Sequence, residues 1–257
     1  SNFMHYMVNK YPDDLMICLD ALTYAGNYNN IKSLENKKNF KFIHGNINDT
    51  FTVTQIFLEY NIDYVVNFAA ESHVDNSILN PRLFVETNII GTQTLLDACR
   101  KYGVKRFHQI STDEVYGDLP LNIGAAFTEN NHIKPSSPYS ASKASADLLV
   151  LAYARTYNIP VTISRCSNNY GPYQHEEKLI PTIIKQALNN MPIPIYGIGE
   201  NVRDWIHVYD HNVGVDYILH YGQEGEIYNL GGRAEKTNLE LVNNCLIKNK
   251  NITLSRR

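Results

Sequence analysis

The hydrophobic pattern of the chain alternates between short apolar runs and longer amphipathic segments. Runs rich in β-branched and aromatic residues predict strands, and segments with apolar residues three and four positions apart predict helices. The expected strands are residues 15–20, 41–45, 63–70, 104–111 and 160–167, and the expected helices are residues 1–10, 52–60, 81–103, 138–157 and 208–222. Because strands and helices alternate, we expect an α/β fold with a doubly wound parallel sheet and helices on both of its faces.

The regular alternation weakens beyond Asn168. Proline and glycine residues interrupt the stretch from 177 to 205, which indicates a smaller second lobe. The predicted domains are a larger one over residues 1–167, to which 203–230 partly return, and a smaller lobe built from 168–202 and 231–257.

The start of the chain departs from the usual order of a doubly wound fold. Such a domain normally begins with a strand and a glycine-rich turn whose N–H groups hold a pyrophosphate. This chain begins at a helix, so we expect the sequence to be a fragment without the first strand and the glycine loop. Gly197 and Gly199 follow a proline-rich stretch and precede no helix, so they predict a turn. Asp20, which ends an expected strand, is placed to bond an adenosine ribose.

Composition excludes several other classes of function. The 257 residues, 44% of them apolar and 11% aromatic, are enough to bury a large core. A net charge of −3 without a basic run gives no indication of a nucleic-acid or anionic-membrane partner. No apolar run approaches the length of a membrane span, and no signal peptide is recognisable. The 4 cysteines form no CxxC pair, which favours reduced thiols in a cytoplasm over disulfides or zinc.

Two sets of side chains are candidates for catalysis. Thr112, Asp113 and Glu114 directly follow an expected strand, and the carboxyl ends of parallel strands are where such folds bind ligands. Tyr139 and Lys143 are four residues apart on an expected helix, so both point to one face. A tyrosine has a pKa near 10, and a neighbouring ammonium favours its phenolate and therefore its use as a base.

The alternatives to catalysis are ordinary structural roles. A Tyr/Lys pair at this spacing is most often a surface contact, and two acids after a strand are most often a solvated turn. The expected helix itself is supported locally, because Ser136 or Ser137 can cap it and Pro138 suits its first turn. His207 and His211 have metal-ligand spacing, but no third ligand is evident, so we expect packing roles and no metal site.

Short motifs spread over nearly the whole chain carry a family resemblance. They are residues 19–27, 67–78, 86–92, 111–118, 135–147, 166–173, 177–181, 194–211 and 228–232. Through them the chain resembles the extended short-chain dehydrogenase/reductase family, and within it most closely the dTDP-glucose 4,6-dehydratases. The YxxxK spacing indicates only the superfamily. The TDE triplet before YG, and RDW followed by DH, are what resemble the dehydratases.

The resemblance implies a lyase (hydro-lyase) that uses NAD and acts in deoxysugar biosynthesis. It converts dTDP-glucose to dTDP-4-keto-6-deoxyglucose by oxidation at C4, elimination of water across C5 and C6, and return of hydride to C6. Tyr139, assisted by Lys143, takes the proton of the C4 hydroxyl, and Thr112 bonds the C4 oxygen. Glu114 is the base at C5, and Asp113 is the acid that releases the C6 hydroxyl as water.

Binding residues are implied by the same resemblance. The larger domain binds NAD, and the expected contacts are Asp20, Leu22, Thr23, Asn46, Ile47, Phe68, Ala69, Ala70, Ser72, Thr87, Tyr139, Lys143 and Asn169. The smaller lobe binds substrate, and the expected contacts are Ser72, Thr112, Asn168, Lys178, Leu179, Pro194, Ile195, Tyr196, Arg203 and Asn238. Lys178 and Arg203 suit the anionic diphosphate. Asn46 stands where the family usually has Asp, and its carbonyl still accepts from the adenine amine.

Two other readings stay open at this point. A related enzyme could act on a GDP- or UDP-linked sugar, or could be an epimerase, which would not need Asp113 and Glu114. The second alternative is a protein that binds NAD or a nucleotide sugar without catalysing a reaction. The family resemblance also implies a homodimer that pairs through the helices expected at 81–102 and 138–157.

Overall fold

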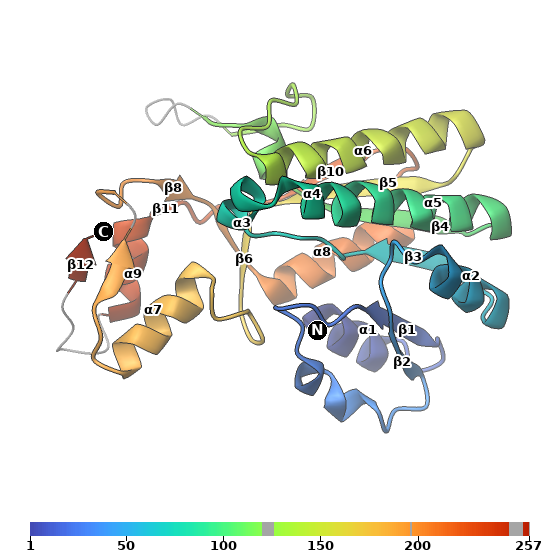
Figure 1. The fold of residues 1–257 in the computed structure, drawn as a ribbon, viewed down its shortest axis with the longest axis horizontal. Coiled ribbons are helices and arrows are strands. Elements are labelled where there is room, and N and C mark those ends of the chain that lie inside the picture. Colours follow the sequence, from blue (N-terminus) through green and yellow to red (C-terminus); the bar gives the residue numbers. More distant parts are fainter. Residues whose placement is uncertain (120–125, 196, 247–253, 257) are drawn as a thin grey trace. The chain divides into compact units, whose positions relative to one another are not determined.

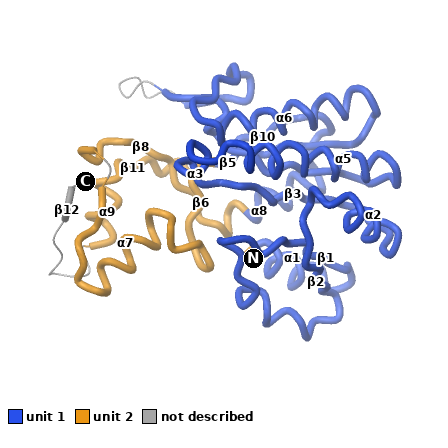
Figure 2. Tube along the Cα trace, in the orientation of Figure 1, with its two compact units in different colours: residues 1, 3–166, 212–230 blue, residues 2, 167–211, 231–257 orange. Residues whose placement is uncertain are grey.

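The computed structural model describes residues 1–119, 126–195 and 197–246, and the backbone alone of 254–256. It divides into two compact units (Figure 2). Unit 1 holds Ser1, Phe3–Cys166 and Asn212–Leu230, and unit 2 holds Asn2, Ser167–His211 and Gly231–Arg257. Among the described residues, no helix combines the length and the apolar composition that crossing a membrane requires.

Unit 1 is built on parallel strands. Four of them form one sheet in the order β10 (Ile227–Leu230), β5 (Val161–Cys166), β4 (Arg106–Thr112) and β3 (Tyr64–Asn67). A separate parallel pair is formed by β1 (Met16–Asp20) and β2 (Phe40–His44). Because neighbouring strands run in the same direction, their carboxyl ends meet at one edge. In the register Thr112 lies opposite Cys166, and Asp20 lies opposite His44.

Helices cover both faces of the four-stranded sheet (Figure 1). The helical segments of unit 1 are α1 (Asn2–Lys10), η1 (Tyr28–Asn30), η2 (Lys32–Leu34), α2 (Thr50–Glu59), α3 (Val74–Leu79), α4 (Pro81–Phe84), η3 (Val85–Ile90), α5 (Gly91–Tyr102), η4 (Asp113–Tyr116) and α6 (Pro138–Tyr157). The helix α8 (Val208–Tyr221) brings the chain back into unit 1. The main core lies between α5, α6 and the sheet, where Leu96, Phe107, Val150, Val161 and Ile163 are fully buried. The predicted parallel α/β class is therefore confirmed.

Local sequence explains where the helix α6 begins and ends. The Ser137 side chain accepts a hydrogen bond from the Ser140 N–H, and the Ser140 side chain accepts one from the Ser137 N–H. The two residues therefore form a capping box at the start of the helix, where Pro138 is the first residue. The helix ends at Asn158, which has a left-handed φ of 57°. The predicted helix over 138–157 is confirmed, with Ser137 as its cap.

Most predicted boundaries agree with the structure to within two residues, and two larger differences occur. The strand expected over 63–70 ends at Asn67, whose side-chain amide donates to Gln109 on β4 and to Thr92 on α5. The apolar residues 68–70 that follow continue the pattern but already belong to the loop at the carboxyl edge, so the prediction of strand was wrong there. The helix expected over 81–103 includes a turn of π-helix, η3, which the hydrophobic period gives no means of predicting.

Unit 2 contains short elements. The strand β6 (Asn168–Tyr170) pairs in parallel with β9 (Trp205–His207), and β8 (Val202–Arg203) pairs antiparallel with β11 (Lys236–Thr237). The strand β7 (Ile193–Ile195) pairs with β12 (Leu254–Arg256), next to the helices α7 (Leu179–Leu188) and α9 (Asn238–Leu246). The core of unit 2 is formed by Ile183, Ile193, Ile195 and Val242. The predicted turn at Gly197 and Gly199 is confirmed by φ angles of 56° and 78°.

A buried carboxylate fastens the helix α1 to α8 inside unit 1. Asp216 is 2% exposed and accepts hydrogen bonds from Tyr6, Tyr11 and Lys10, the last at 2.5 Å. Burial alone would raise the pKa of Asp216, but these hydrogen bonds and the Lys10 charge hold it below its usual value.

Asp216→Asn is therefore expected to lower the free energy of unfolding at neutral pH by about 2 kcal/mol, the scale of hydrogen bonds to a charged group. A depressed native pKa stabilises the fold above the unfolded pKa of about 3.9, and this contribution is lost as the pH falls through the native value. Urea unfolding between neutral and acidic pH measures the effect. The exposed Asp13→Asn variant is the control, and equal stabilities of the two variants at neutral pH would contradict the assignment.

Candidate active site

Most of the unit 1 residues expected to act in catalysis or to bind NAD lie at the carboxyl ends of its strands. The exceptions are Thr87 on η3 and the pair of Tyr139 and Lys143 on α6. Asp20 ends β1, Asn46 follows β2, Phe68 follows β3, and Thr112 ends β4. Parallel pairing brings the ends of β3, β4 and β5 to one side of the sheet, which is where open α/β folds bind their ligands. The fold thus places the predicted groups where such ligands bind.

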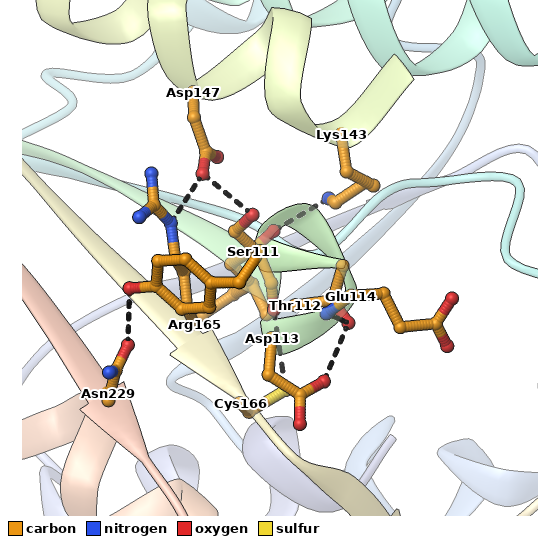
Figure 3. A network of polar contacts seen from close by, with 11 residues as sticks. Ser111, Thr112, Asp113, Glu114, Lys143, Asp147, Arg165, Cys166 and Asn229 are labelled. Atoms are coloured by element: carbon orange, nitrogen blue, oxygen red, sulfur yellow. Dashed lines mark hydrogen bonds and ion pairs between the residues drawn. The ribbon is translucent and has the colours of Figure 1, made fainter. Parts of the chain in front are cut away.

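The triplet at the end of β4 turns at once into the short helix η4 (Figure 3). The Thr112 hydroxyl caps this helix by accepting from the Glu114 N–H at 3.2 Å, and it donates to the Asp113 carboxylate at 3.3 Å. Thr112 is buried, whereas Asp113 and Glu114 are half-buried. Their carboxyl groups point in different directions from the turn, so each can reach a different atom of a substrate.

Tyr139 and Lys143 share the buried face of α6, as their spacing predicts. They are 9% and 4% exposed. The Thr112 hydroxyl and the charges of Glu114 and Asp113 are all close enough to Tyr139 to act on its phenol. The Lys143 ammonium donates to the Ile110 carbonyl of β4 at 2.7 Å. The phenol, the hydroxyl and the two carboxyl groups therefore belong to one site.

The protonation of Tyr139 differs from what its spacing from Lys143 alone suggests. Burial, and then the negative charge of Glu114, raise the pKa of Tyr139 above its ordinary value, although the nearby Thr112 hydroxyl lowers it. Burial also lowers the pKa of Lys143, against the charge of Asp147. These side chains alone therefore hold Tyr139 as a phenol, and a phenolate requires a further positive charge in the site.

The adenosine end of the predicted NAD site has suitable chemistry. Asp20 is exposed, and its carboxylate accepts from the Leu22 N–H at 2.8 Å, so the acid is held in place while open to solvent. The Asn46 side chain accepts from the Asn48 N–H at 3.1 Å. The Ile47 side chain is 6% exposed and part of the main core, so only its backbone can contact a ligand.

The other predicted NAD contacts lie after β1, along the loop after β3, on η3 and in unit 2. Phe68 is 42% exposed and packs against Phe3, with 4.9 Å between the ring centres, and Ser72 is also exposed. Thr23 is exposed, Leu22, Ala69, Ala70 and Thr87 are half-buried, and Asn169 belongs to β6 of unit 2. Ribose hydroxyls suit the Asp20 carboxylate and the pair on α6, and an aromatic ring suits Phe68. The residues present fit NAD.

Most of the predicted substrate contacts belong to unit 2. They are Asn168, Lys178, Leu179, Pro194, Ile195, Arg203 and Asn238, and Tyr196 lies outside the described residues. The Lys178 ammonium is 3.6 Å from the Glu177 carboxylate, and Arg203 is exposed. Ile195 packs in the core of unit 2, so its predicted role can rest only on its backbone.

The predicted packing roles of the two histidines agree with the structure. His207 packs edge-on against Tyr170, and the buried His211 has its pKa lowered to about 4 by desolvation. No three His, Cys, Asp or Glu side chains form a possible metal site in the part of the chain that the structure describes.

Three buried side chains of the site are absent from the prediction. Asp147 and Arg165 form an ion pair of 2.9 Å with side-chain exposures of 0% and 2%. Asn88 on η3 exchanges hydrogen bonds with the Glu71 backbone and donates to Ser142 on α6 at 2.8 Å. One available signal is the spacing of Asp147, which follows Lys143 by four residues, and another is the arginine inside an otherwise uncharged strand.

Comparisons with known proteins bear on this geometry. The family model described as GDP-mannose 4,6 dehydratase matches residues 1–256. The chain belongs to this family. The dTDP-glucose 4,6-dehydratase of Mycobacterium tuberculosis (strain ATCC 25618 / H37Rv) is 50% identical over 246 residues, which are 96% of this chain and 73% of the relative.

Two solved structures are also similar. The dTDP-glucose 4,6-dehydratase of Bacillus anthracis in complex with NAD has a TM-score of 0.90 at 45% identity, covering 100% of this chain and 80% of that one. The enzyme from Streptomyces venezuelae with NAD bound has a TM-score of 0.92 at 43% identity, covering 99% and 80%. The predicted resemblance to the dTDP-glucose 4,6-dehydratases is confirmed.

Proposed function

We propose that this protein catalyses the NAD-dependent dehydration of dTDP-glucose to dTDP-4-keto-6-deoxyglucose. The observation that carries the proposal is the burial of Tyr139 and Thr112 together with the action of the Glu114 and Asp113 charges on the phenol. A phenol, a hydroxyl and two carboxyl groups are the set that oxidation followed by elimination of water needs. Relatives that are close to half identical and carry this name support the same reaction.

Each side chain has one step in this mechanism. Tyr139 accepts the proton of the C4 hydroxyl, while Thr112 bonds the C4 oxygen. NAD, held by Asp20, the loop after β3 and the pair on α6, would supply the positive charge that favours the phenolate and the capacity to accept hydride from C4 and to donate it to C6. The new C4 ketone makes the C5 hydrogen acidic. Glu114 removes that proton, and Asp113 protonates the C6 hydroxyl as it leaves as water.

The test is to incubate the full-length protein with dTDP-glucose, GDP-mannose and UDP-glucose separately and to identify the products by mass and NMR. A 4-keto-6-deoxy sugar formed only from dTDP-glucose, with no net change in reduced nicotinamide, is expected. Turnover of GDP-mannose alone would assign the protein to the substrate after which its family model is named. Binding of NAD without formation of any product would contradict the proposal and would indicate a protein that only binds NAD.

Unit 2 is proposed to bind the nucleotide end of the substrate. Lys178 precedes the first turn of α7, and Arg203 ends β8 with an exposed side chain. Both cations suit a diphosphate, and the guanidinium of Arg203 adds a planar pair of donors. Arg203→Lys is suited to testing this role, because it keeps the charge and should raise KM while leaving kcat nearly unchanged.

The proposed assembly is a homodimer formed by the helical stretch 81–102, which comprises α4, η3 and α5, and by α6, which packs against it in unit 1. Leu83, Ile90 and Leu148 expose large apolar side chains along these helices and the turns before them, with 55% exposure at Leu148. Leu148→Glu places a charge in this surface and is expected to give a monomer in analytical ultracentrifugation. Leu188→Glu, at the exposed end of α7, is the matched control. A dimer that survives Leu148→Glu would exclude this interface.

The proposed location is the cytoplasm. Cys18, Cys99, Cys166 and Cys245 all lie in the part of the chain that the structure describes and take part in no disulfide, as suits a reducing compartment. Dehydratase activity in a periplasmic or secreted fraction of the source cells would contradict this.

A further inference from the structure

The carboxylate of Asp147 is shared by three elements of unit 1. Asp147 is fully buried on α6, one turn beyond Lys143. It accepts hydrogen bonds from the Ser111 hydroxyl of β4 and from the Arg165 guanidinium of β5, both at 2.9 Å (Figure 3). A charge without access to water is stable only with such partners, so this carboxylate fixes the positions of α6, β4 and β5 together.

Each partner of Asp147 adjoins the proposed active site. Ser111 directly precedes Thr112, and Arg165 directly precedes Cys166, which lies opposite Thr112 in the sheet. The Arg165 guanidinium also lies 4.8 Å from the centre of the Tyr116 ring, and Tyr116 ends η4. The network therefore holds the catalytic triplet at both of its ends, through Ser111 before it and Tyr116 after it.

Asp147 also acts on the charge of Lys143. Burial lowers the pKa of Lys143, while the charge of Asp147, and then that of Cys166, raise it. The charged and titratable groups around Lys143 and Tyr139 are Asp147 on α6, Arg165 and Cys166 on β5, and Asp113 and Glu114 on η4. Towards α6, the segment η3 contributes the neutral amide of Asn88. Asp147 is thus the nearest acidic group on the helix that carries Lys143.

We propose that Asp147 is a positioning residue of this site. Its buried carboxylate holds the end of β4 in place through Ser111 and keeps Lys143 as an ammonium, while Arg165 balances its charge. Because Asp147 has no exposed surface, it acts through these neighbours and not by contact with substrate or NAD. This inference rests on the proposed dehydration, because the groups that Asp147 positions are the ones that act in that reaction.

The decisive variants are Asp147→Asn and the double variant Asp147→Asn/Arg165→Gln. The single change keeps the size of the side chain but leaves the Arg165 charge unbalanced. Lys143 then loses its proton at lower pH, so the alkaline limb of the pH profile of kcat is expected to move to lower pH by about 1 unit. This is the size of shift expected when one nearby opposite charge is lost. The double variant removes both charges, and the limb is expected to return towards that of the unaltered protein. A merely structural pair predicts the opposite, since the double variant loses more contacts.

The charge of Lys143 is measured without turnover by NMR titration of isotope-labelled lysine in the NAD-free protein, assigned with Lys143→Met. This titration tests the effect of Asp147 on Lys143 even if dTDP-glucose is not the substrate. Failure of the inference and failure of the proposed function are therefore distinguishable. A Lys143 titration that is the same in the single and double variants would overturn the inference.

Ser111→Ala tests the positioning half of the inference and leaves the ion pair intact if Asp147→Asn does not fold. It is expected to lower kcat about tenfold without moving the alkaline limb, the loss that misplaced catalytic groups produce. Asp97→Asn is the matched control, because Asp97 also accepts one hydroxyl bond next to α6, from Tyr153. A kcat of Ser111→Ala equal to that of Asp97→Asn would show that Ser111 does not position the triplet.

Discussion

Glu114→Gln is expected to stop dehydration while leaving the oxidation at C4 intact. Glutamine keeps the shape of the side chain and its place on η4, but it cannot take the C5 proton. General base catalysis contributes roughly 100- to 10,000-fold, so kcat should fall by that amount. Because hydride cannot return to C6 before water has left, reduced nicotinamide should accumulate after mixing with dTDP-glucose.

Two measurements in one experiment check this. Rapid mixing follows the absorbance of reduced nicotinamide, and NMR in deuterated water follows exchange at C5. Asp118→Asn is the control, because Asp118 is an exposed acid just after the same short helix. Fast exchange of the C5 hydrogen in Glu114→Gln would show that another group is the base.

Tyr139→Phe is expected to block the reaction one step earlier. The ring is nine-tenths buried and packs edge-on against Phe84, with 6.3 Å between the ring centres, so phenylalanine can occupy the same place. What is lost is the phenol oxygen that accepts the C4 proton. We expect a fall in kcat of roughly 100- to 10,000-fold, with no accumulation of reduced nicotinamide. This last feature distinguishes the variant from Glu114→Gln.

Binding must survive for the Tyr139→Phe result to have this meaning. Calorimetry with NAD should give an affinity within a small factor of that of the unaltered protein, because Asp20 and the loop after β3 are untouched. Tyr157→Phe is the matched control, since Tyr157 lies on the same helix with a more exposed ring. Accumulation of reduced nicotinamide in Tyr139→Phe would show that another group accepts the C4 proton.

The sequence predicts the elements of unit 1 better than their internal connections. Strands β4 and β5 and helix α6 follow from apolar runs, a capping serine and a proline, all of which are local signals. Arg165 is different. The role of an arginine in this otherwise uncharged strand is evident only from its contacts with Asp147, 18 residues earlier, and with the ring of Tyr116. Such contacts depend on how distant segments pack together, and the local hydrophobic periodicity of the sequence carries no information about that packing.

The protonation of the site is equally hard to read from spacing. The i,i+4 relation of Tyr139 and Lys143 correctly places both on one buried face. It does not reveal that burial opposes the charged form of each, or that the lysine donates to the Ile110 carbonyl. Spacing indicates which groups meet, whereas their charge states depend on how much water reaches them.

Asn88 limits how far this scaffold can be redesigned. Its single amide group bonds the Glu71 backbone in both directions and also reaches Ser142, so it replaces a missing piece of secondary structure between η3, the loop and α6. A carboxylate at this place would lose the donors, and an aliphatic residue would leave the Glu71 peptide unsatisfied. A mutagenesis library aimed at new sugar substrates can therefore vary the exposed loop residues freely, but it should leave position 88 as it is.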